Sequence, residues 1–233
     1  MQHQIIGTTM PVLEFNLAGG ESVVSESGRL SWMSPDVTMA TSTSATGGGG
    51  GHKLLGAIKR MAGGGSLFAS TYTASGAGGL VAFAATQPGQ ILPVSVTPNA
   101  GYMVHRHGFL AATPGIELTM GFQQSLGAGL FGGEGFILQK LGGQADAWVQ
   151  LQGEVVRYDL QPGQGMLVHP AHVGMFNDHM SFQITVMKGL KNKFFGDEIF
   201  LVSFTGPGSI WLQSLTLPGL AADLIPYLPE PTN

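Results

Sequence analysis

The chain has 233 residues, a formal net charge of −4, no cysteine, and only 10% charged residues, against roughly 25% in typical globular proteins. The acidic balance argues against DNA as a partner and makes RNA the least favoured one, because nucleic-acid binding uses basic surfaces. The absence of cysteine excludes disulfides, thiolate metal sites and cysteine nucleophiles.

From residue 12 onward one pattern recurs three times, which predicts three units over residues 12–97, 98–160 and 161–217. A first matching stretch occupies residues 23–30, 103–110 and 167–174. Each stretch is followed by an alternating run and then by a glycine turn. The last strand of each unit carries, at matching offsets, Ala82, Trp148 and Trp211.

Short segments between these marks alternate apolar and polar residues, and turns rich in glycine and proline bound them. Period-two alternation of this kind is typical of half-buried strands, and the 37 glycines suit tight turns better than helices. The sequence therefore predicts an all-β protein with a single domain over residues 1–233. Its three tandem modules, of β-sandwich or double-stranded β-helix type, enclose one shared apolar interior.

Short helical inserts are expected at residues 52–62, 125–131 and 188–195, each just before the glycine turn of its unit. Two of them mix apolar residues with six of the ten basic residues, namely Lys53, Lys59, Arg60, Lys188, Lys191 and Lys193. Such a mixture suits an anionic membrane surface or an acidic protein partner. Alternatively, the apolar residues plug the ends of the β-core while the basic groups stay in water.

A C-terminal tail follows the third unit over residues 218–233. It contains a short helical turn at residues 220–224, followed by three prolines. The tail is expected to be a cap or a loose end.

The histidines are the candidates for a metal site. His105 and His107 are two residues apart, so on a strand they would share a face, and the repeat places His169 at the position of His105. A cupin-like barrel would need a glutamate a few residues later, whereas Glu117 comes ten residues after His107. The alternative is that these are turn and surface histidines, with no cofactor bound.

No enzyme signature stands out. The carboxylates form no clear catalytic pair, and the Gly-x-Ser-x-Gly elbow of serine hydrolases is absent.

So few charged residues favour self-association, and we expect a homo-oligomer. With no secretory signal and no apolar run of roughly 20 residues, the expected location is the cytoplasm, peripheral to a membrane.

Four stretches together resemble a known family, that of the mitochondrial biogenesis protein called altered inheritance of mitochondria twenty-four. They are residues 20–28, 108–111, 133–135 and 205–208 with Gln213-Ser214. The third unit departs from the family pattern at His169, where an aspartate is expected, and at Gly196-Asp197-Glu198, where Gly-Glu-Gly is expected.

The resemblance implies three β-modules around a pseudo-threefold axis, similar to the subunits of the tryptophan RNA-binding attenuation protein, and implies no enzyme activity. Eukaryotic relatives are linked to the organisation of the mitochondrial inner membrane. We therefore expect a non-enzymatic oligomeric β scaffold or interaction module at a membrane surface. The alternative is a small-molecule or metal-binding barrel that uses His105, His107 and His169.

Overall fold

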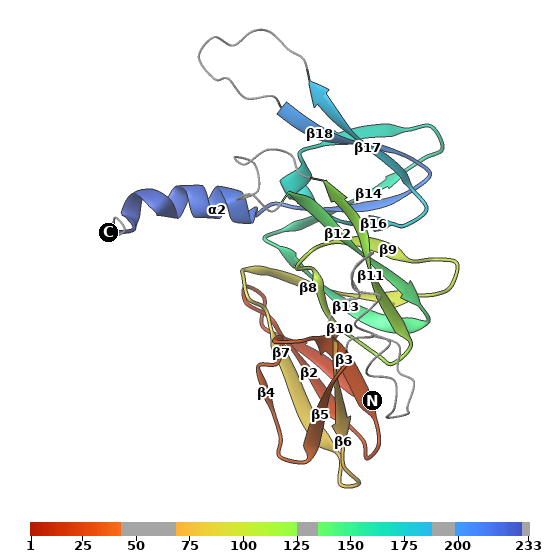
Figure 1. Cartoon of the computed structure of the whole chain (residues 1–233), viewed down its shortest axis with the longest axis vertical. Helices are drawn as coiled ribbons and strands as arrows, with labels where there is room; N and C mark the ends of the chain where they lie inside the picture. Colours follow the sequence, from red (N-terminus) through yellow and green to blue (C-terminus); the bar gives the residue numbers. More distant parts are fainter. Residues whose placement is uncertain (43–68, 125–134, 188–198, 230–233) are drawn as a thin grey trace.

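The computed structural model describes residues 1–42, 69–124, 135–187 and 199–229 (Figure 1). In these ranges the chain is mostly β, with four antiparallel sheets and one α-helix, α2 (Leu217–Leu224), near the C-terminus. The predicted β class is confirmed. The three expected helical inserts, and with them all six of their basic residues, lie outside the described residues.

Within the described ranges each unit contains six strands, and β1 (Gln2–Ile6) precedes the first unit. The first unit contains β2 (Val12–Leu17), β3 (Ser22–Glu26), β4 (Trp32–Met33), β5 (Val37–Ser42), β6 (Ala69–Ala74) and β7 (Gly79–Ala84). The second contains β8 (Gly89–Val96), β9 (Tyr102–His105), β10 (Phe109–Ala112), β11 (Ile116–Gln124), β12 (Phe136–Gly143) and β13 (Ala145–Gln152). The third contains β14 (Val155–Leu160), β15 (Gly165–Val168), β16 (Val173–Asn177), β17 (Ser181–Met187), β18 (Ile199–Thr205) and β19 (Gly208–Gln213).

The same strand pairings occur in all three units. The sixth strand pairs with the first and the third. The fifth strand pairs with the second and the fourth. Each unit is thus a pair of three-stranded halves. Grouping strands by pairing starts the second and third units at β8 and β14, one strand earlier than the boundaries expected from the sequence.

Neighbouring units are joined edge to edge. β3 pairs with β10, and β9 pairs with β16, so each joint merges two halves into one six-stranded sheet. The units follow one another along the longest axis of the molecule (Figure 1). The pairings establish the repeat and this order; they do not establish a pseudo-threefold axis, which stays a prediction.

The register of the joints corrects the sequence alignment by one residue. Val24 pairs with Ala112, and Met103 pairs with Phe176. Ala111 lies opposite Trp148, and Met175 lies opposite Trp211. Ala112 and Phe176 are the next residues, so their positions are equivalent. Val24 is therefore the counterpart of Met103, whereas the aligned repeats placed Val23 there. Both faces of β3 are buried, so alternation between a buried and an exposed face does not fix its register, and the sequence alone could not specify it.

The buried apolar residues of the described ranges form three clusters rather than one shared core. One lies between the four-stranded sheet and the first six-stranded sheet, and one lies between the two six-stranded sheets. The third lies between the second six-stranded sheet and the three-stranded sheet. Three separate layers result because the sheets stack face to face along the molecule. The expectation of a single common interior was wrong.

Strand sequences reflect this stacking. In β2 the alternate residues Leu13, Phe15 and Leu17 are buried, because its sheet has one covered face. In β10, an inner strand, all four residues are buried. Among the described residues no helix combines the length and the apolar character needed to cross a bilayer.

Candidate functional site

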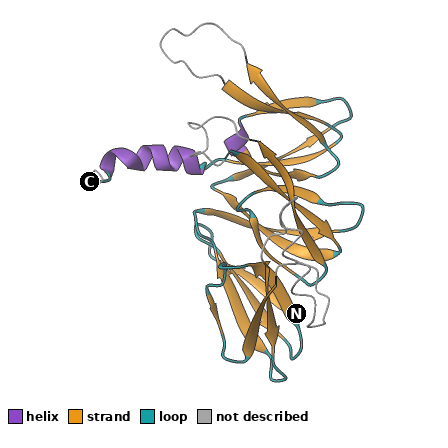
Figure 2. Ribbon diagram, in the orientation of Figure 1, coloured by secondary structure: helices purple, strands orange, loops and turns teal. Residues whose placement is uncertain are grey.

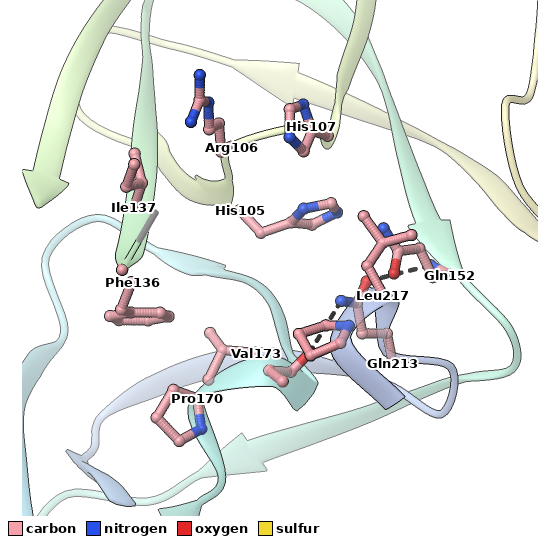
Figure 3. A pocket seen from close by; sticks show the side chains of 13 residues that line it. His105, Arg106, His107, Phe136, Ile137, Gln152, Pro170, Val173, Gln213 and Leu217 are labelled. Atoms are coloured by element: carbon pink, nitrogen blue, oxygen red, sulfur yellow. Dashed lines mark hydrogen bonds between the residues drawn. The ribbon is translucent and has the colours of Figure 1, made fainter. Parts of the chain in front are cut away.

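A pocket lies at the joint between the second and third units (Figure 3). Its volume is about 130 Å³, and its lining comes from the end of β9, the start of β12, the end of β13 and the 3₁₀ turn Pro170–His172. Leu217 and Pro218, at the start of α2, complete it. The pocket is thus assembled from segments far apart in the sequence.

His105 is the central polar group of this pocket, and its imidazole extends toward Gln152 and Leu217 (Figure 3). Its Nε2–H donates a hydrogen bond of 3.4 Å to the backbone carbonyl of Gln150. Burial lowers the pKa of His105 from 6.5 to about 4, since a charged imidazole would lose its hydration. At neutral pH the ring is therefore neutral, and Nδ1 is left as a hydrogen-bond acceptor.

The three histidines predicted as candidate metal ligands are not brought together. His107 lines the pocket with His105, but it lies beyond the end of β9, where strand alternation no longer applies. His169 instead caps the 3₁₀ turn, its Nδ1 accepting from the backbone N–H of Ala171 at 3.3 Å. Within the described ranges, no three His, Asp or Glu residues are placed to hold a metal ion.

A second pocket adjoins the first and shares Arg106, His107 and Ile137 with it. Its volume is about 340 Å³. Glu26, at the end of β3, lines it, and burial raises the pKa of this carboxyl against the opposing effects of the Gln139 hydrogen bond and of Arg29. The arrangement can form hydrogen bonds with a small polar molecule.

Sequence reasoning missed a pair of buried glutamines that fasten neighbouring units. Gln213 is buried, and its Oε1 accepts from the backbone N–H of Gln152 at 3.1 Å. Its Nε2 donates to the carbonyl of Ala171, also at 3.1 Å. The Nδ1–H of His172 donates to the backbone carbonyl of Gln213 at 2.7 Å. The third unit is thereby tied to the end of the second.

Gln150 has the equivalent role between the second unit and the first. Its Oε1 accepts from the backbone N–H of Thr86 at 3.4 Å, and its Nε2 donates to the carbonyl of Gln87 at 3.5 Å. Both glutamines follow their unit's tryptophan by two residues, a spacing visible in the sequence. In the first unit Ala84 occupies the equivalent position.

Comparisons with known proteins agree with this architecture. The model of a family described as mitochondrial biogenesis AIM24 matches residues 3–215. An uncharacterized protein of Streptococcus pyogenes serotype M6 is 31% identical over 225 residues, which cover 96% of this chain and 89% of that protein. The crystal structure of a Streptococcus pyogenes protein superposes with a TM-score of 0.74 at 26% identity, covering 97% of this chain and 99% of that one.

Proposed function

The chain belongs to the mitochondrial biogenesis AIM24 family, and from this premise we propose that it is a non-enzymatic, self-associating β scaffold that touches a membrane surface. The observation that carries the proposal is the distribution of exposed apolar side chains. Large ones occur on both edge strands of the first sheet and in the turn after β1, at Ile5, Ile6, Met10, Trp32 and Met33. Others lie on the C-terminal segment, at Leu224, Ile225, Tyr227 and Leu228.

Self-association would cover the apolar groups at the ends of the β body. A weakly charged surface supports this, because few charges oppose the approach of a second copy. Light scattering over a range of concentrations tests it. The expected mass is a multiple of that of one chain, and the mass of a single chain at every concentration would contradict the proposal.

The C-terminal segment supplies the membrane contact in this proposal. Thr216 caps α2, its Oγ1 accepting from the backbone N–H of Gly219 at 3.2 Å. The helix buries none of its residues and extends away from the strands (Figure 2). Tyr227, beyond the helix, is 85% exposed. Apolar side chains with an aromatic residue suit the interface between headgroups and acyl chains.

A variant that ends at Gly219 is expected to lose binding to neutral phosphatidylcholine vesicles in a co-sedimentation assay. It keeps Leu217 and Pro218 in the pocket, and none of residues 220–229 that it removes is buried, so its thermal unfolding is expected to match that of the full chain. Stronger binding of both proteins to anionic vesicles at low salt would assign a further contact to the basic inserts. Equal sedimentation of the two proteins with neutral vesicles would contradict the role of the segment.

A further inference from the structure

Among the strands that the structure describes, two half-sheets at opposite ends of the molecule lack the neighbouring half that the other four have. In the six-stranded sheets, the second strand of one unit pairs with the third strand of the next. The last sheet has the order β15-β18-β17, and the first has the order β1-β2-β7-β4. Among the described strands, β15 therefore has only β18 beside it, and β4 has only β7.

The free β4 edge exposes residues that the joints bury. Met33 pairs with Val81 in the sixth strand of its unit, as Ala112 and Phe176 pair within theirs. Ala112 and Phe176 lie at joints and are 0% exposed, whereas Met33 is 38% exposed. Its neighbour Trp32 is 47% exposed.

The free β15 edge shows the same contrast. Leu167 pairs with Ser203, and its counterpart Met103 pairs with Lys140. Ser203 and Lys140 each stand eight residues before their unit's tryptophan, so the two positions are equivalent. Met103 is 6% exposed, and Val24, at the same position in the first unit, is 5% exposed. Leu167 is 55% exposed.

We propose that β15 of one copy pairs antiparallel with β4 of a second copy, with Leu167 directly opposite Met33. This inference rests on the proposed self-association and names its interface. The register repeats that of Val24 with Ala112 and of Met103 with Phe176. The new sheet has the order β17-β18-β15-β4-β7-β2-β1, the arrangement of the six-stranded sheets extended by β1.

The partner is a second copy rather than the same chain. β4 and β18, the neighbour of β15, lie at opposite ends of the long axis (Figure 1). Directly opposite residues of an antiparallel pair share a face, so Leu167 and Met33 are covered together by the second copy's first six-stranded sheet. A head-to-tail contact of this kind leaves one edge free on each copy, and repetition gives a ring or a filament.

Cysteine cross-linking tests the register directly, because the chain contains no cysteine. Met33→Cys and Leu167→Cys proteins are mixed in equal amounts and oxidised mildly. A disulfide needs Cα atoms within about 7 Å, so we expect about tenfold more linked dimer from this mixture than from the matched control. The control pairs Leu167→Cys with Val156→Cys, which lies on β14 and is 48% exposed.

Light scattering on two further variants separates this inference from the general proposal. A Leu167→Lys protein is expected to fall to the mass of one chain, whereas Val156→Lys keeps the mass of the wild type. Three results would overturn this interface but not self-association in general. They are oligomers that persist in the Leu167→Lys protein, no cross-link between Met33→Cys and Leu167→Cys, and a cross-link between two Leu167→Cys chains. If the wild-type protein has the mass of a single chain, both the β15–β4 interface and the general proposal of self-association are contradicted.

Discussion

Replacing Trp148 by alanine is expected to lower the free energy of unfolding by about 3–5 kcal/mol, the usual cost of removing a buried tryptophan. Trp148 belongs to the second unit, but its side chain is buried against the first. Its ring meets Phe15 edge-on at 4.7 Å between centroids and His3 at 4.8 Å. The variant thus opens a cavity between two stacked sheets. Urea denaturation measures the loss.

Trp211 offers a matched control at the equivalent position of the third unit. It is only half-buried, with Tyr102 at 5.9 Å and the guanidinium of Arg157 at 5.1 Å from its ring. We expect Trp211→Ala to cost roughly 1–2 kcal/mol, through lost aromatic and cation–π contacts. Equal losses at the two positions would contradict the assignment of Trp148 to a buried joint.

Acidification is expected to destabilise the protein through His105. Its pKa is about 4 in the folded chain, against 6.5 for a free imidazole, so the unfolded chain binds the proton more tightly. The free energy of unfolding is then unaffected by this group above about pH 7, and it falls as the pH drops from about 6.5 to about 4. A pKa difference of this size corresponds to about 3 kcal/mol when complete.

Replacing His105 by glutamine, which does not titrate, isolates this contribution. Between pH 7 and pH 4 the His105→Gln protein is expected to lose less stability than the wild type, as followed by urea midpoints. His179→Gln serves as the control, because His179 is exposed. A pH dependence that is identical in the wild type and the His105 variant would show that the imidazole is well hydrated in the folded chain.

The repeat carried most of what the sequence could predict. Alternation between glycine turns identified the β class, and the matched tryptophans located the same strand in the second and third units. The tail was also visible: a turn was predicted at residues 220–224, and α2 begins three residues earlier because Thr216 caps it. Signals of this kind come from residues close together in the sequence, so they can be recognised without knowing which strands pair.

What the sequence left open depends on pairing between units. β3 carries one valine on each face and both are buried, so the two valines themselves do not tell which of Val23 and Val24 lies opposite Ala112. His105 and His107 could be expected to share a face only if the strand continued past His105, and it ends there. Gln150 and Gln213 were detectable by spacing, but their hydrogen bonds reach backbone groups of another unit.

The free edges became visible only from the pairings. Trp32, Met33 and Leu167 are ordinary apolar residues in the sequence, and their exposure follows from the place of their strands at the two ends. Exposed strand edges of this kind are sites where another chain can add. Here the joints within the chain specify the register of that addition.

Amide hydrogen exchange of the wild type, at high and low protein concentration, tests most directly that the sheets continue from one copy to the next. We expect slow exchange at residues 165–168 and 32–33 in concentrated solution and faster exchange on dilution. We expect no change at the outer edge of β14, which has only β19 beside it among the described strands. Fast exchange at both β15 and β4, equal at all concentrations and no slower than at β14, would contradict the continuation of the sheets between copies.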